Sequence, residues 1–176
     1  MVGSNTQPPV LAVQTPPALT CLNTTRIISG SVTQPASNYS VQWTTVGGTF
    51  VAGQNTTTPT VSDPGTYQMN VLDQSNGCNA FVSVTVSENV VAPQASATAI
   101  DPLTCDDTIV SLGSTGSSTG TNITYAWNGP VIESGGTTAS PQVSGAGTYT
   151  VTVTDLNNGC VATATATVAS NTTPPV

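Results

Sequence analysis

Four cysteines carry the most obvious chemistry in this chain. Cys21 and Cys105 each follow a Leu-Thr pair, whereas Cys78 and Cys160 each follow an Asn-Gly pair. Metal binding or thiolate catalysis favours histidine partners or a CxxC spacing, and the chain has neither. We therefore expect disulfides. Of the three possible connectivities, only Cys21 with Cys78 and Cys105 with Cys160 respects the sequence repeat described below. Disulfides predict an oxidising, extracellular or cell-surface location.

Catalysis is the function that the remaining side chains favour least. The chain has one basic residue, Arg26, and eight carboxylates, with no lysine or histidine to serve as a general base. A pair of carboxylates can hydrolyse a glycoside, but most of these acids lie in predicted turns, and no pair falls in a predicted apolar pocket. We expect a protein that is not an enzyme.

The overall charge excludes two classes of binding partner. Only 5% of the 176 residues are charged, and the formal net charge is −7. With one basic residue, the chain cannot neutralise the phosphates of a nucleic acid or the headgroups of an anionic membrane. No apolar run approaches the ~18 residues of a transmembrane helix. We expect no nucleic-acid partner and no membrane insertion.

Two tandem repeats organise the chain. Four markers recur in the same order with a shift of 82 or 84 residues: LTC at 19–21 and 103–105, Trp43 and Trp127, GTY at 65–67 and 147–149, and NGC at 76–78 and 158–160. So many ordered matches indicate a duplicated structural unit. Proline-containing segments mark the borders, which predicts repeats at 8–88 and 92–172, with linker or boundary segments at 1–7 and 173–176.

Each repeat has the pattern of short β-strands. Apolar and polar residues alternate around Trp43 and Tyr67 in the first repeat and around Trp127 and Tyr149 in the second, and we place these four aromatics in the core. Prolines and glycines interrupt the pattern every 8 to 12 residues, whereas helix signals are almost absent. All six tryptophans and tyrosines receive core positions, so no aromatic platform for sugars is predicted. Short alternating strands of this kind predict an all-β antiparallel sandwich.

Two further features resemble immunoglobulin-like domains. A tryptophan ends an early strand, and the segment 63–67 (DPGTY) resembles the tyrosine corner of those domains. The resemblance implies two tandem immunoglobulin-like sandwiches with one disulfide each. The chain departs from it at Met69 and Val151, where those domains carry a cysteine.

An immunoglobulin-type strand order also implies a group of acids near the joint between the repeats, if the start of the second repeat and its last turn share one end of the sandwich. The acids that would gather there are Glu88, Asp101, Asp106, Asp107 and Asp155. Clustered oxygen ligands suit calcium, which is the one cofactor that we consider. The alternative, which we favour, is that Asp106 and Asp107 form a solvated turn, that Asp155 caps a hairpin, and that the chain needs no cofactor.

The chain as a whole resembles the tandem domains of large bacterial surface proteins. The residues that carry the resemblance are Tyr125-Ala126-Trp127, the segment 147–155 (GTYTVTVTD) and Asn158-Gly159-Cys160, with a weaker copy in the first repeat. Similar segments occur in polycystic-kidney-disease-like repeats and in the adhesin repeats of gliding bacteria that use type IX secretion. The resemblance specifies an architecture better than an activity, because such repeats act as stalks, adhesins and spacers.

We therefore expect a structural or adhesive repeat module of an extracellular bacterial protein. It would extend an adhesin or filament, or present a weakly binding surface many times over. Expected partners are neighbouring repeats of the same chain, with surface glycans or like chains as further candidates. The main alternative is a carbohydrate-binding or spacer module of a secreted hydrolase.

Overall fold

The computed structural model describes residues 6–35 and 37–171. The chain forms two compact units, the first ending at Val90 and the second beginning at Val91. Of the predicted boundary segments 1–7 and 173–176, only residues 6 and 7 fall within the described part. In that part, no helix is long and apolar enough to cross a membrane.

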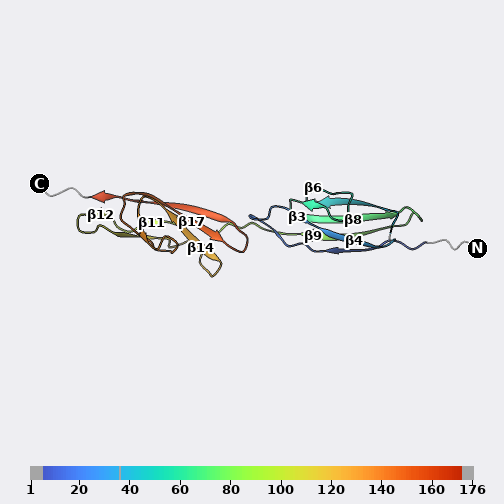
Figure 1. The fold of residues 1–176 in the computed structure, drawn as a ribbon, viewed down its shortest axis with the longest axis horizontal. Helices are drawn as coiled ribbons and strands as arrows, with labels where there is room; N and C mark the ends of the chain where they lie inside the picture. The colour runs from blue at the N-terminus through green and yellow to red at the C-terminus, as the bar shows by residue number, and fades with distance from the viewer. Residues whose placement is uncertain (1–5, 36, 172–176) are drawn as a thin grey trace, which may run out of the picture. The chain divides into compact units, whose positions relative to one another are not determined.

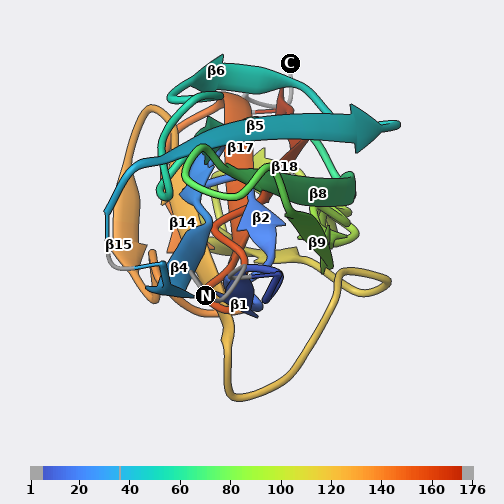
Figure 2. The ribbon, with the colours of Figure 1, turned by 90° about the vertical axis from the view of Figure 1, so that its right-hand side faces the viewer.

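The first unit is an antiparallel sandwich, and its described part contains the strands β1 to β10 (Figure 1). One layer has the order β5-β8-β9, made of β5 (Tyr39–Val46), β8 (Gly65–Asp73) and β9 (Asn79–Val86). The other layer has the order β3-β7-β6, made of β3 (Arg26–Ile27), β7 (Thr60–Val61) and β6 (Phe50–Ala52), with β4 (Ser29–Gln34) continuing β3 and pairing with β1 (Val10–Gln14). The short β2 (Leu19–Thr20) pairs in parallel with β10 (Glu88–Asn89). Figure 2 shows β8 between β5 and β9.

The second unit repeats this arrangement. Its first layer has the order β14-β17-β18, made of β14 (Ile123–Asn128), β17 (Gly147–Asp155) and β18 (Val161–Val168). The facing layer has the order β11-β13-β16-β15, made of β11 (Thr98–Ala99), β13 (Val110–Gly113), β16 (Gln142–Val143) and β15 (Ile132–Ser134). The short β12 (Leu103–Thr104) pairs in parallel with β19 (Ser170–Asn171). The predicted all-β, immunoglobulin-like fold of both repeats is therefore confirmed.

The aromatic residues of the alternating strands lie between the layers. Trp43 and Tyr67 are fully buried in the first unit, and Tyr149 is fully buried in the second, where Trp127 is 7% exposed. The indole Nε1 of Trp43 donates to the carbonyl of Thr56 at 2.8 Å, which fixes the β6–β7 loop over the core. A buried indole needs such a partner, because its unpaired N–H would carry the full cost of desolvation.

The tyrosine corner forms in the first unit as the DPGTY segment predicts. The Tyr67 hydroxyl donates to the carbonyl of Asp63 at 2.6 Å and accepts from the backbone N–H of Thr49 at 3.0 Å. Burial raises the pKa of this hydroxyl above its ordinary value, because a phenolate would lose its hydration there. The Tyr149 hydroxyl makes the equivalent bond to Gly145 at 2.8 Å, although that corner lacks the acid.

Each unit has two distinct ends, which we call leading and trailing. At the leading end of the first unit, the Asn76 amide in the β8–β9 turn donates to the carbonyl of Gln7 in the incoming chain at 3.1 Å. At the trailing end, the last strand finishes beside β2. The second unit has the same ends, with the Asn158 amide donating to the carbonyl of Val91 at 2.9 Å. In each unit, the chain therefore enters at one end and leaves at the other.

Candidate functional sites

A hydrogen-bonded turn at the trailing end holds the first cysteine of each repeat. The Thr20 N–H donates to the carbonyl of Asn23, and the Thr20 hydroxyl accepts from the N–H of Asn23, both at 3.0 Å. Thr104 and Asp107 make the same two bonds at 2.9 Å. The threonine of the Leu-Thr-Cys motif thus closes the turn by a side-chain contact that this residue type often makes. The cysteines inside these turns are Cys21 and Cys105.

A second turn, at the leading end, holds the other cysteine. In the first unit the Asn76 carboxamide oxygen accepts from the N–H of Cys78 at 2.8 Å, while its amide holds the incoming chain. Gly77 has φ of 74°, in the left-handed region that favours glycine, which explains the Asn-Gly-Cys order. The Asp73 carboxylate closes the turn by accepting from the N–H of Ser75 at 2.8 Å. The second unit repeats these contacts around Asp155, Asn158, Gly159 and Cys160.

The two cysteines of one repeat therefore lie at opposite ends of the sandwich. Cys78 directly precedes β9, whereas Cys21 follows β2, which pairs with the continuation of β9 at its far end. The eight residues of β9 span about 26 Å at ~3.3 Å per residue. A disulfide requires Cα atoms within ~7 Å. The same separation applies between Cys105 and Cys160 across β18.

The predicted pairing of Cys21 with Cys78 and Cys105 with Cys160 is wrong for this reason. In the structure, Cys78 is a free thiol, whereas Cys21 and Cys160 each take part in a disulfide. The prediction placed both cysteines of a repeat at one end, because it did not count the segment that crosses the sandwich before each Leu-Thr-Cys motif. The alternation of β1 was the available signal for that crossing.

The prediction that the five acids gather at one end of the second unit is also wrong, because its two ends are separated by the length of the sandwich. In the second unit, Asp101, Asp106 and Asp107 flank β12 at the trailing end, whereas Asp155 lies in the leading-end turn. Glu88 begins β10 of the first unit and is exposed. Among the described residues, no three acidic, cysteine or histidine side chains gather closely enough to hold a metal ion. The Asp155 carboxylate instead accepts from the N–H of Asn157 at 2.8 Å, which is a turn-closing role.

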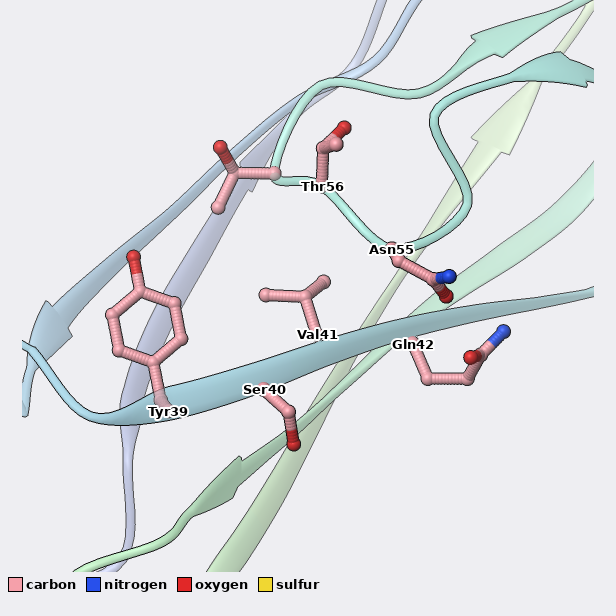
Figure 3. A pocket seen from close by; sticks show the side chains of 7 residues that line it. Tyr39, Ser40, Val41, Gln42, Asn55 and Thr56 are labelled. Carbon is pink, nitrogen blue, oxygen red and sulfur yellow. The ribbon is translucent and has the colours of Figure 1, made fainter.

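A polar pocket of about 520 Å³ opens on the first unit between β5 and the β6–β7 loop (Figure 3). Tyr39 stands at one side of it, Asn55 and Gln42 lie at the other, and Val41 forms the base between them. Within the part of the chain that the structure describes, the side chains of Tyr39 and Asn55 have no protein hydrogen-bond partner. No charged side chain lines the pocket. An aromatic ring opposite the unpaired amide of Asn55 suits an uncharged, hydroxyl-rich ligand.

In the second unit the corresponding surface differs in one residue and one loop, and a pocket of about 260 Å³ there is lined by Tyr125 and by residues of the β13–β14 connection. Tyr125 takes the place of Val41, and its hydroxyl donates to the carbonyl of Ser118 at 2.7 Å. Ser118 belongs to the β13–β14 connection, 114–122, which is longer than the β4–β5 connection, 35–38, of the first unit. Tyr39, which the sequence assigns to the core, packs against the core cluster but is only partly buried, so it also lines the pocket. The exchange of Val41 for Tyr125 between the repeats was the signal for an asymmetric surface.

Among the comparisons with known proteins, only the search of solved structures finds proteins similar to this chain. No protein-family model matches the chain, and no curated protein matches it. Three N-terminal domains of the outer capsid protein Hoc of bacteriophage RB49 are 17% identical, with 92% of this chain and 59% of that chain covered and a TM-score of 0.46. Immunoglobulin domains 1–5 of Sidekick-1 are 10% identical, with 94% of this chain and 40% of that chain covered and a TM-score of 0.40. The fibronectin(III)-like modules of Clostridium thermocellum CbhA are 14% identical, with 93% of this chain and 95% of that chain covered and a TM-score of 0.36. Likenesses this distant carry no argument about the function of this chain.

Proposed function

We propose that the chain is a structural, non-catalytic repeat segment of an extracellular protein, which extends an adhesin or filament at a cell surface. One observation carries this proposal. In each unit the chain enters at the leading end and leaves at the trailing end, so each repeat in a series adds its own length to the tether. The disulfide-bonded cysteines fit an oxidising, extracellular compartment.

The terminal strands also suit a protein that bears load. A pull on the two ends of the first unit draws β2 toward the leading end and β10 toward the trailing end. Because these neighbours are parallel, their hydrogen bonds are loaded together in shear, including the bond from the Leu19 N–H to the Ser87 carbonyl at 2.9 Å. The second unit has the same geometry, with the Leu103 N–H donating to the Ala169 carbonyl at 2.9 Å.

The bacterial setting belongs to the same proposal. It rests on the similarity of the Tyr-x-Trp, GTYTVTVTD and Asn-Gly-Cys segments to the repeats of large surface adhesins, including those of gliding bacteria with type IX secretion. A series of such repeats would multiply any weak contact that one copy makes, because the contacts share one tether.

Single-molecule pulling tests the load-bearing role. A variant with all four cysteines replaced by serine is pulled between its two termini, and then between the N-terminus and a cysteine introduced as Ser75→Cys in the leading-end turn. The first geometry shears β2 against β10, whereas the second peels the first unit open one hydrogen bond at a time. We expect a several-fold higher unfolding force in the first geometry. Equal forces would remove the mechanical argument.

The pocket beside Tyr39 supports a second candidate function, carbohydrate binding. The unpaired hydroxyl of Tyr39, the unpaired amide of Asn55 and the lack of charge in the pocket suit a neutral sugar. A multimerised form of the chain is applied to a glycan array together with two pocket variants, Asn55→Ala and Val41→Tyr. The matched control is Thr137→Ala, at the position of the second unit that corresponds to Asn55. Binding that both pocket variants lose and the control keeps supports this function, whereas binding that all three share places the ligand elsewhere.

A further inference from the structure

The solvent side of the β5-β8-β9 layer in the first unit is a second surface with the chemistry of a binding site. We propose that it binds an extended, uncharged polysaccharide that lies along β8. This surface shares a ligand class with the pocket beside Tyr39, but it does not depend on that pocket.

Strand alternation defines this surface, which we call the outer face. It consists of the even-numbered residues of β5 (40–46) and β8 (66–72) and the odd-numbered residues of β9 (79–85), all of them exposed or half-buried. Figure 3 shows Ser40 leaving β5 on the side opposite Val41. None of the outer-face residues is charged, so the surface suits a neutral ligand.

One aromatic ring stands on the outer face. Phe81 of β9 is 69% exposed, and Leu72 of β8 is 42% exposed. In the strand register, Phe81 lies opposite Asn70 and Leu72 lies opposite Asn79, so each apolar side chain has a carboxamide beside it. A flat aromatic ring can stack on the apolar C–H side of a sugar ring, and the neighbouring amide can then reach the hydroxyl groups at the rim of that sugar.

Three carboxamides of the outer face share one arrangement, in which the nitrogen bonds to the sheet and the oxygen is left over. The nitrogens donate from Asn70 to the Gln42 carbonyl at 3.3 Å, from Gln68 to the Ser83 hydroxyl at 3.4 Å, and from Gln42 to the Trp43 carbonyl at 3.2 Å. Within the described part of the chain, the three carboxamide oxygens accept no protein hydrogen bond, and the Asn79 side chain makes none. The face therefore offers mainly acceptors, which match a ligand rich in hydroxyl donors.

Two shallow hollows give the outer face its length. One of about 340 Å³ is lined by Leu72 and Asn79 among others, and one of about 120 Å³ is lined by Thr66 and Gln68 among others. Leu72 and Thr66 are six residues apart in β8, which corresponds to about 20 Å at ~3.4 Å per residue. A ligand that fills both hollows must be extended, which favours a polysaccharide chain over a single sugar.

Two other occupants fit this surface less well. A second copy of the chain would place one acceptor-rich face against another and leave buried carboxamide oxygens without donors, which is costly. An extended peptide gains most by pairing with the backbone at a sheet edge. The outer face is centred on β8, the middle strand of its layer, so it offers side chains rather than a backbone edge.

The second unit keeps the strands but not these side chains. At the equivalent positions, Thr163 replaces Phe81, Thr152 replaces Asn70 and Ala126 replaces Gln42. The two repeats thus share a fold, while only the first combines the exposed ring with the carboxamide oxygens. The second unit therefore supplies matched control positions.

Affinity electrophoresis of the intact chain tests the proposal. Native gels contain hydroxyethyl cellulose, xyloglucan or galactomannan as neutral polysaccharides, or carboxymethyl cellulose as a charged counterpart. We expect at least one neutral polysaccharide to retard the protein and carboxymethyl cellulose not to do so. Phe81→Thr, which introduces the residue type of the second unit, should raise the dissociation constant about tenfold. Because Phe81 is exposed, urea titration should show an unchanged free energy of unfolding for this variant.

Two controls separate this surface from the rest of the chain. Thr163→Ala in the second unit and Asn55→Ala in the pocket beside Tyr39 should both keep the retardation. Retardation that Asn55→Ala loses and Phe81→Thr keeps would overturn the proposal and assign the binding to the pocket. Retardation by none of the neutral polysaccharides, or equal retardation by carboxymethyl cellulose, would also overturn it. The pulling experiment above is independent of all these outcomes, because it measures force without any ligand.

Discussion

Reducing the protein should not release chain from within the first repeat. A bridge between Cys21 and Cys78 would shield roughly 56 residues from a pull on the two termini, which corresponds to about 200 Å of extended chain at ~3.5 Å per residue. Because these two cysteines lie at opposite ends of the first unit, we expect no such gain in extension on reduction.

The assay pulls the oxidised protein between two cysteine-free marker domains, first without and then with a thiol reductant. The marker domains count single molecules, and the difference in total extension measures any stretch that a bridge within a repeat had closed. Cys78→Ser should behave as the unmodified protein does, because Cys78 is a free thiol.

A gain of about 200 Å on reduction would refute this reasoning, because it would indicate a bridge between Cys21 and Cys78. Two separate gains of that size would indicate a bridge within each repeat.

Three further predictions concern the tyrosine corner. Tyr67→Phe leaves the N–H of Thr49 and the carbonyl of Asp63 without their hydroxyl partner. It should therefore lower the free energy of unfolding of the first unit, measured by urea titration, by about 1–3 kcal/mol. An unchanged free energy of unfolding would mean that water replaces the hydroxyl. Because folding raises the pKa of Tyr67, the contribution of its hydroxyl to stability is complete below the unfolded-state pKa of about 10 and is lost as the pH rises through the folded-state pKa. The melting temperature above pH 10 should therefore depend less on pH in Tyr67→Phe than in the unmodified protein. An identical pH dependence in the two proteins would contradict this assignment. Gly48→Ala should lower the melting temperature because its Cβ would overlap the Tyr67 ring and hydroxyl, whereas Gly136→Ala, whose Cβ would meet its nearest neighbour at 3.5 Å, should change it little; equal effects would show that the corner adjusts freely.

The fold could be predicted from the sequence because its signals are local and repeated. Alternation around Trp43 and Tyr67 indicates which side of each strand faces inward, and both side chains are fully buried. The DPGTY segment indicates the corner that Tyr67 closes. The Asn-Gly-Cys motif indicates a turn, and Asn76 and Gly77 build it with a carboxamide contact and a left-handed backbone. These features depend on neighbours within a few residues.

The pocket could be predicted only in part. The sequence shows Tyr39 and Val41 in one repeat against Ile123 and Tyr125 in the other, but it does not show which of these side chains meets a covering loop. That outcome depends on the β13–β14 connection, which reaches Tyr125 through Ser118 in the second unit and has a shorter counterpart in the first. Loop coverage is a long-range property, so the open side of β5 could not be assigned from alternation.

The sequence by itself determined that two similar all-β sandwiches follow one another and that their cysteines recur in two fixed motifs. The tertiary structure decided at which end of the sandwich each motif lies. The physical reason is the pairing of the short strands β2 and β12, which bond in parallel to β10 and β19 and so hold Cys21 and Cys105 at the trailing ends. A two-residue strand has no periodicity that reveals its partner, and only hydrogen bonds to a segment nearly seventy residues away fix its place. This pairing separates the two cysteines of each repeat and so rules out a bridge within one sandwich.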